Sequence, residues 1–211
     1  MKRWEMGAAV LTLCTLIPVS RAEIILDNTG SSVNKYVGSP FGEVFTMSGT
    51  SGNISALTLQ MDVLSTGGSA EVDLYNVSSG LPGSKIVQLG TISGATTGDL
   101  QSLAVSSLNN YLLSAGTEYA IVLQTPSPST SMGWDYTSSS ASGGTGTIDG
   151  GYYLSGGIWN PNSSGYNFQF DLQTTPVPEV PLTGWVMGCG VLAIAAGGTL
   201  RRRFRSSLSN S

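Results

Sequence analysis

Apolar and polar residues alternate along several short segments of this chain, and this two-residue period restricts the fold more than any other feature. Every second residue is apolar from Leu57 to Val63, and the same holds from Ala70 to Leu74. Residues two apart in a β-strand lie on the same face, so both segments are predicted to be strands with one buried face. No segment of residues 23–175 carries a sustained helical period with caps. We therefore predict an all-β domain.

Other short segments have the same strand-like character: Ile86–Leu89, Tyr119–Leu123, Phe168–Leu172, Ile24–Leu26, Val44–Met47, Leu103–Val105, Trp134–Tyr136 and Tyr152–Leu154. Gly, Ser, Thr and Asn separate them, and many short strands at turn-rich spacing are typical of a β-sandwich or jelly roll. The stretch Ser138–Gly151 is almost pure Ser, Gly and Thr, so it is predicted to be a mobile loop.

The N-terminal end has the features of a secretory signal peptide. Met1–Arg3 is basic, and an apolar stretch follows from Met6 to Ile17. Ser20 and Ala22 place small residues at the two positions that signal peptidase reads. We expect cleavage after Ala22, which leaves Glu23 as the first residue of the mature chain.

An uncharged segment near the C-terminal end is predicted to be a transmembrane helix. Thr183–Leu200 comprises 18 residues without a charge. A helix of that length spans about 27 Å, close to the ~30 Å hydrocarbon core of a bilayer. Positive charge beside a membrane span stays on the cytoplasmic side, so the domain before the helix is expected outside the cytoplasm, held at the inner membrane. The residues that stop the helix from slipping through are Arg201, Arg202, Arg203 and Arg205.

The order of proline motif, apolar helix and basic cluster resembles the PEP-CTERM sorting signal of Gram-negative bacteria. The motif here consists of Val177, Pro178, Glu179, Val180 and Pro181, with Val180 in place of the second proline of the family pattern. The resemblance implies processing near this motif by an exosortase, a membrane-embedded enzyme. It also implies a host that makes exopolysaccharide and forms biofilm. Proline fixes φ and keeps the motif out of helices and sheets, which suits an exposed processing site.

A second resemblance concerns the exported domain, over roughly Ile24 to Leu172. The segments that carry it are Phe45-Thr46, Leu57–Leu59, Val72–Tyr75, Gly80–Gly83 and Thr117–Tyr119. In this order they are similar to the choice-of-anchor R family, which joins a β-rich exported domain to alternative anchors. No activity is established for that family, so the resemblance implies a fold and a location but no reaction.

Together these features predict a signal peptide at 1–22, an exported β-domain at 23–175, a sorting signal at 176–205 and a short tail at 206–211. Within the sorting signal, the motif occupies 177–181, the helix 183–200 and the basic cluster 201–205.

Charge and residue usage exclude several classes of function. Residues 23–178 contain two basic and eleven acidic residues, a net charge of −9. Nucleic acid and anionic lipid heads repel such a domain, so we expect no nucleic-acid partner. The chain has no histidine, and its two cysteines, Cys14 and Cys189, lie in the hydrophobic ends. The domain therefore lacks the usual general base, a thiol nucleophile and the commonest metal ligand.

Two sets of polar side chains are candidates for a catalytic site or a metal site. Glu71 and Asp73 share a strand face about 7 Å apart, a spacing compatible with an inverting glycosidase. Acids that alternate on a strand are also the ordinary solvent face of a sandwich, and we favour that interpretation, so no catalytic residue is predicted. No metal site or cofactor is predicted either. A structural calcium ion is an alternative, for which the oxygen ligands would be Asp27, Asn28, Asp149 and Asp171.

Aromatic residues gather in the last third of the domain: Trp134, Tyr136, Tyr152, Tyr153, Trp159 and Tyr166. Exposed rings can stack on sugar faces, and the candidates for such stacking are Trp134, Tyr153 and Trp159. The other interpretation is that the rings fill the core, where aromatic side chains supply much of the burial.

The sequence thus favours a non-catalytic structural or adhesive component of the cell surface or extracellular matrix, associated with exopolysaccharide. A carbohydrate-binding module or a carbohydrate-active enzyme is the alternative.

Overall fold

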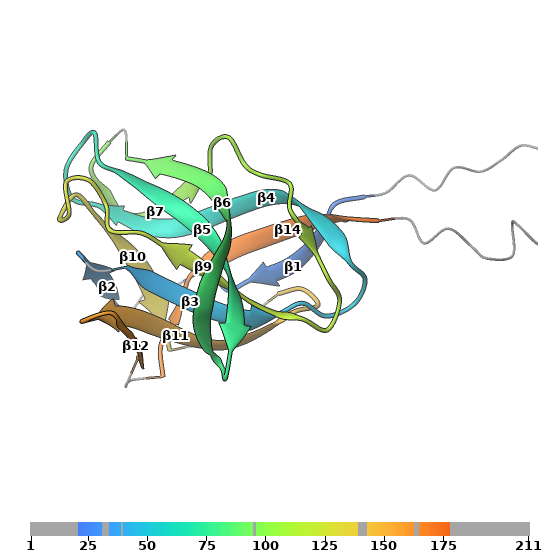
Figure 1. Ribbon diagram of the computed structural model, residues 1–211. Coiled ribbons are helices and arrows are strands. Elements are labelled where there is room, and N and C mark those ends of the chain that lie inside the picture. The colour runs from blue at the N-terminus through green and yellow to red at the C-terminus, as the bar shows by residue number, and fades with distance from the viewer. Residues whose placement is uncertain are drawn as a thin grey trace, which may run out of the picture. The chain divides into compact units, whose positions relative to one another are not determined.

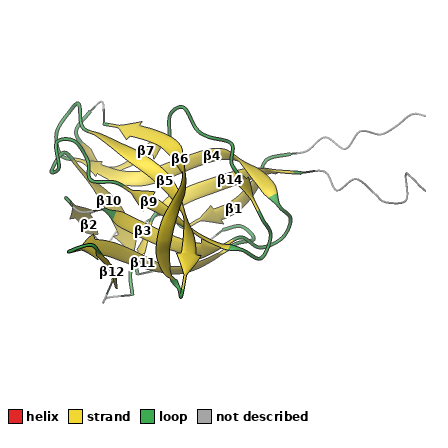
Figure 2. Ribbon diagram, in the orientation of Figure 1, coloured by secondary structure: helices red, strands yellow, loops and turns green. Residues whose placement is uncertain are grey.

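The computed structural model describes residues 21–30, 34–38, 40–94, 96–138, 143–162 and 165–177. All regular secondary structure in these residues is β-strand (Figure 2). Among them, no helix is long and apolar enough to cross a membrane. The predicted signal peptide up to Ser20, the motif residues Pro178–Pro181, the helix Thr183–Leu200 and the arginines from Arg201 to Arg205 lie outside the described residues.

The first sheet contains eight strands in the described part of the chain, in the order β1-β14-β4-β10-β13, with β7 and β8 paired to β4 and β2 paired to β10. All its pairings are antiparallel. Its strands are β1 (Glu23–Asp27), β2 (Asn34–Val37), β4 (Gly52–Val63), β7 (Gly98–Ala104), β8 (Leu112–Leu113), β10 (Met132–Thr137), β13 (Asn167–Phe168) and β14 (Phe170–Pro176).

The second sheet contains six strands in the same described ranges, in the antiparallel order β12-β11-β3-β9-β5-β6. Its strands are β3 (Phe41–Thr46), β5 (Ser69–Ser78), β6 (Leu81–Ser93), β9 (Glu118–Leu123), β11 (Thr147–Ser155) and β12 (Ile158–Pro161). The predicted all-β class is therefore confirmed, as two antiparallel sheets consistent with a β-sandwich.

The predicted loop Ser138–Gly151 is wrong in its second half, because β11 begins at Thr147. Thr147 and Ile148 pair with Thr46 and Phe45 of β3, and Ile148 packs against the core. Backbone pairing to a central strand supplies the order that this Gly- and Thr-rich sequence does not encode by propensity.

The main core contains apolar side chains from both sheets, including Leu59 of β4, Phe170 of β14, Phe45 of β3 and Leu74 of β5, all fully buried. Trp134 of β10 is also fully buried. Its ring stacks on Phe168 at a centroid distance of 4.8 Å, and its Nε1–H donates to the carbonyl of Gln169 at 2.8 Å.

The proposal of Trp134 as a glycan-stacking residue is therefore wrong. The Trp134 ring is fully buried, so a sugar cannot reach either face of it. Its one polar atom, Nε1, already donates a hydrogen bond to the backbone.

The polar face of β4 is buried as well, which the alternating pattern did not predict. Gln60 and Asp62 are both less than 10 % exposed. Gln60 Nε2 donates a hydrogen bond to the carbonyl of Leu100. Asp62 Oδ1 accepts a hydrogen bond from the Leu100 N–H at 2.7 Å, and Asp62 Oδ2 forms an ion pair with Lys35 at 2.6 Å. The segment around Leu100 thus covers the face that was expected in water.

The β5–β6 hairpin forms one edge of the second sheet. It lies in front of β3 and β11 in the view of Figure 1 and contacts β3. A Cβ added at Gly42 of β3 would lie 3.2 Å from Cγ of Pro82 in the hairpin. This close approach shields part of the sheet surface that faces away from the main core.

Candidate functional site

A small apolar cluster lies on the outer face of the second sheet. Val44 of β3 and Ala120 and Val122 of β9 alternate with the core residues of their strands, yet each is at most 1 % exposed. The partly buried side chains that cover them are Tyr75, Val77, Tyr152 and Trp159. An outer sheet face is usually polar, so this aromatic cover marks the surface as a candidate binding face.

A cavity of about 310 Å³ adjoins this face, and we call it the Tyr152 pocket. It lies between β11 and the residues 161–162 and 165–167. Its lining residues are Ile148, Asp149, Gly150, Gly151, Tyr152, Pro161, Asn162, Gly165, Tyr166 and Asn167. The Tyr152 ring belongs both to this lining and to the cover of the outer cluster, so pocket and face form one continuous candidate site.

A β-bulge places Asp149 at the pocket. Ile148 pairs with Phe45 and Gly150 pairs with Val44, so Asp149 is the inserted residue of β11. A bulge bends its strand and redirects a side chain, which is a common device beside binding sites. Asp149 is exposed, and its Oδ2 accepts a hydrogen bond from Thr46 Oγ1 at 2.7 Å.

The other wall of the pocket is tied to β11 through the backbone. The N–H of Asn162 donates to the carbonyl of Gly151 at 2.8 Å, and the N–H of Gly165 donates to the carbonyl of Asn162 at 3.0 Å. Gly165 has a φ of +66°, a conformation that favours glycine. Tyr166, the next residue, packs against Tyr136 at a ring-centroid distance of 4.7 Å.

A fully buried carboxyl group, Glu43, lies behind the pocket wall. A Cβ added at Gly151 would lie 3.0 Å from Glu43 Oε2, so only glycine leaves room between this carboxyl and the pocket. Glu43 Oε2 accepts the N–H of Phe168 at 2.8 Å, whereas Oε1 has no hydrogen-bond partner among the described residues. Burial raises the pKa of Glu43 well above its ordinary value, and the nearby Asp149 charge adds to the increase.

Acidic side chains lie close to Tyr152. Burial raises the pKa of the Tyr152 hydroxyl, and the carboxylates of Glu43, Asp149 and Glu118 raise it further. Both lysines of the domain form ion pairs with acidic residues that do not line this pocket. Lys35 pairs with Asp62 at 2.6 Å, and Lys85 pairs with Asp73 at 2.7 Å.

The predicted solvent-facing acids Glu71 and Asp73 differ strongly in exposure. Asp73 is fully buried, contrary to the expectation of an ordinary outer face, whereas Glu71 is partly exposed. Lys85 of β6 contacts both carboxylates, and Gln124 Nε2 donates to Asp73 Oδ2 at 2.7 Å.

The electrostatics of the two acids differ as well. Burial raises the pKa of Asp73 against the lowering effect of Lys85 and Gln124, whereas the hydrogen bond from Lys85 lowers the pKa of Glu71. Because one lysine holds both groups, they form an ion-pair network rather than a free acid and base on either side of an open cleft.

The three predicted stacking residues are not brought together. Tyr153 pairs with Phe41 across β3, which places it on the side of β11 that faces the core, at the sheet margin, where it is 37 % exposed. Trp159 of β12 pairs with Leu154 of β11 and packs on the outer cluster.

Tyr152 belongs to the aromatic group in the last third of the domain, but it is not among the three residues predicted to stack on sugars. Alternation shows that neighbouring residues of a strand face opposite ways, but it does not show which way leads to a pocket. The signal available in the sequence was the pair of glycines, Gly150 and Gly151, directly before Tyr152.

The four proposed calcium ligands do not form a site. Asp27 and Asp171 are register partners on β1 and β14, whereas Asp149 belongs to the other sheet. The Asn28 side chain forms hydrogen bonds with the backbone. Its Nδ2 donates to the carbonyl of Phe168 at 2.9 Å, and its Oδ1 accepts the N–H of Phe170 at 2.8 Å. Within the described ranges, no group of three or more acidic, cysteine or histidine side chains could hold a metal ion.

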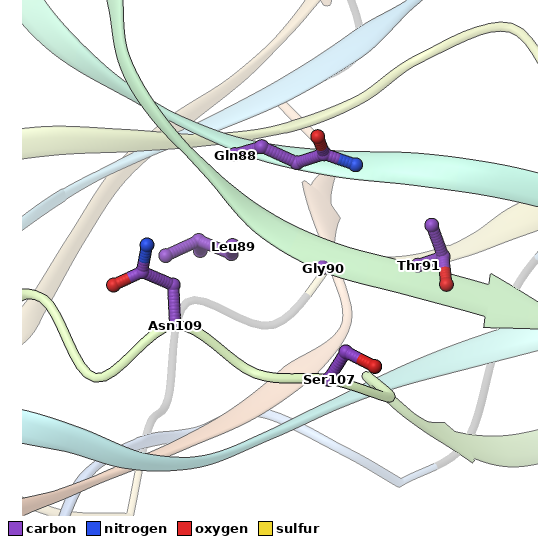
Figure 3. A pocket seen from close by; sticks show the side chains of 6 residues that line it. All are labelled: Gln88, Leu89, Gly90, Thr91, Ser107 and Asn109. Atoms are coloured by element: carbon purple, nitrogen blue, oxygen red, sulfur yellow. The ribbon is translucent and has the colours of Figure 1, made fainter.

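A second hollow, of about 410 Å³, lies where the segment 105–109 crosses β6. Figure 3 shows the side chains that line it, which are those of Gln88, Leu89, Thr91, Ser107 and Asn109, together with Gly90. It contains neither a ring nor a charged group, so it offers less to a ligand than the Tyr152 pocket. Gly90 is needed for the crossing, because a Cβ there would lie 2.4 Å from the carbonyl oxygen of Ser106.

Comparison with known proteins gives a fold but no family. No family model matches the chain, and no curated protein matches it. One similar solved structure contains the cysteine protease and lectin-like domains of Cwp84, a surface layer associated protein of Clostridium difficile, with a TM-score of 0.53 and 17 % identity. Another is the clostridial cysteine protease Cwp84 after propeptide cleavage, with a TM-score of 0.53 and 18 % identity.

The matches cover 74 % of this chain but only 36 % and 41 % of the two Cwp84 chains. The chain therefore spans less than half the length of these structures. At this level of identity, the likeness shows a shared fold alone.

Proposed function

We propose that this chain is an exported surface or matrix protein whose β-domain is a non-catalytic, adhesive component that binds exopolysaccharide. The observation that carries the proposal is the outer face of the second sheet, where Tyr152 and Trp159 cover a buried apolar cluster beside a pocket. Flat rings with polar groups at their margin match the alternating apolar faces and hydroxyl edges of a sugar.

Two further facts support a binding role over a catalytic one. The chain has no histidine, and the acid pair Glu71 and Asp73 is held by a single lysine. One similar solved structure carries a domain described as lectin-like, which is in keeping with a jelly-roll-like sandwich that binds sugars.

The proposed route to the surface comes from the two ends of the chain. Signal peptidase removes residues 1–22, the helix 183–200 holds the domain at the inner membrane, and an exosortase-type enzyme acts at the PEP-CTERM-like motif 177–181. The last strand, β14, ends at Pro176, and the N–H of Val177 donates to the carbonyl of Ser51 at 3.1 Å. The motif thus follows the β-domain directly, and cutting there would release the domain intact to the cell surface or the biofilm matrix.

Replacing Trp159 with alanine should abolish or strongly reduce retention of the full chain on immobilised exopolysaccharide from a biofilm-forming Gram-negative host. The reason is that the variant removes a ring from the proposed binding face. Tyr153→Ala is the matched control, because it removes an exposed ring on the opposite side of the adjacent strand and should leave retention unchanged.

Equal loss of retention in both variants, or none in either, would reject this face as the binding surface. Hydrolysis of the polysaccharide that disappears in Glu71→Gln would reject the non-catalytic role.

The sorting part of the proposal predicts a new C-terminus. When the full chain is produced with a partner exosortase, mass spectrometry of the mature protein should show an end within residues 177–181, with the helix and the arginines removed. Without the enzyme the chain should keep Ser211. An unchanged C-terminus in both cultures would contradict exosortase processing while leaving the binding proposal in place.

A further inference from the structure

The Tyr152 pocket has the size and lining of a site for one sugar unit. Its volume of about 310 Å³ is at the lower end of the roughly 300–1,000 Å³ that small-molecule sites occupy. Tyr152 and Tyr166 supply rings, and the glycines Gly150, Gly151 and Gly165 allow a ligand to approach the backbone closely.

Charge narrows the class of sugar that fits. Asp149 lies in the lining, and Oδ1 of its carboxylate accepts no hydrogen bond from the described part of the chain. Glu118 on β9 adds a second carboxylate close enough to influence Tyr152, whereas burial raises the pKa of Glu43 and favours its neutral form. Because Lys35 and Lys85 are held by Asp62 and Asp73, neither lysine neutralises these groups.

The Asp149 carboxylate in the lining disfavours uronic acids and sulfated sugars, because like charges repel at close range. It favours a cation, which gains a charge-assisted hydrogen bond to the open oxygen of Asp149.

We propose that the Tyr152 pocket binds an amino sugar with a free ammonium group, of the kind found in a partly deacetylated polysaccharide. The ammonium donates to Asp149 Oδ1, and the apolar face of the sugar ring rests on the tyrosine rings. This inference deepens the proposed function, because it names the class of polysaccharide that the domain would recognise.

The test is calorimetric titration of the full chain in non-ionic detergent with three oligomers of equal length, made of glucosamine, N-acetylglucosamine or a uronic acid. The glucosamine oligomer should bind most tightly. Asp149→Asn should weaken it by about 10-fold or more, which is the effect of losing one hydrogen bond to a charged group. Tyr152→Ala should also weaken binding.

The net charge of the domain alone would attract a cationic oligomer, so the control must remove one charge elsewhere. Asp99→Asn serves, because Asp99 lies on β7 of the other sheet with 78 % of its side chain exposed. This variant should bind within about 2-fold of the wild type, since exposed charges beyond a Debye length of about 8–10 Å interact weakly.

Equal weakening by Asp149→Asn and Asp99→Asn would overturn the pocket assignment. Tighter binding of the N-acetylated or uronic oligomer would overturn the ammonium specificity. In both cases the proposed adhesive function would survive. If the chain binds none of the three oligomers and is not retained by exopolysaccharide, both proposals fall together.

Discussion

The Trp134→Ala variant should lose about 3–5 kcal/mol of unfolding free energy, the range measured for truncation of large buried aromatic side chains. Trp134 is fully buried, stacks on Phe168 and donates its indole N–H to the carbonyl of Gln169. Truncation leaves a cavity against Phe168, which adds to the lost burial, whereas the Gln169 carbonyl still accepts the Gln60 N–H at 3.1 Å.

Urea unfolding of the full chain in non-ionic detergent, followed by circular dichroism, measures this loss. Trp159→Ala is the matched control, since its half-buried ring on the outer cluster should contribute only about 1–2 kcal/mol. Trp134→Phe keeps most of the apolar volume and should be intermediate, which gives a readable result even if the alanine variant does not fold. A loss below about 1 kcal/mol in both Trp134 variants would contradict its place in the core.

The Glu43→Gln variant should gain stability relative to the wild type as the pH rises. The folded pKa of Glu43 lies well above its ordinary value of 4.5, because the carboxyl is buried and the charged form loses its hydration. Below pH 4.5 the group is protonated in both the folded and the unfolded state, so it adds no pH dependence.

Between pH 4.5 and the folded pKa, the unfolded chain ionises first, so the wild type loses stability with rising pH. Each pH unit of that interval corresponds to about 1.4 kcal/mol. Glutamine keeps an oxygen to accept the Phe168 N–H and cannot ionise, so it should not show this loss.

Denaturant unfolding of both chains at pH 4 and pH 8 tests this. The difference between Glu43→Gln and the wild type should shift in favour of the variant between the two pH values. Glu118→Gln, which removes a carboxylate from an exposed position on β9, corrects for the loss of one negative charge. A difference that stays constant from pH 4 to pH 8 would show that Glu43 ionises normally in the folded protein.

Short segments rich in apolar residues predict most of the strands from the sequence alone. The segments around Leu59 and Val72 became β4 and β5, because an alternation of apolar and polar residues is a local pattern that can be read from the sequence. Pairing is not local, and for this reason the Gly- and Thr-rich start of β11 was predicted as a loop.

Burial of individual polar and aromatic residues was the least predictable property. Asp73 and Trp134 are both fully buried, although the first was expected in water and the second was considered for a surface site. The burial of each of these two side chains depends on contacts with residues from other segments of the chain. Gln124 on the segment after β9 and Lys85 on β6 contact Asp73, and Phe168 covers Trp134.

The amino-acid sequence by itself determined the all-β class, most of the strands and the strongly acidic character of the domain, because these follow from residue type and from a period of two along the chain. Only the tertiary structure decided that Tyr152 and Asp149 line one pocket with Glu43 behind its wall, while Tyr153 and Trp159 separate. The reason is that a bulge, a hairpin crossing and the register between distant strands fix which faces of the chain come together, and none of these is set by neighbouring residues alone.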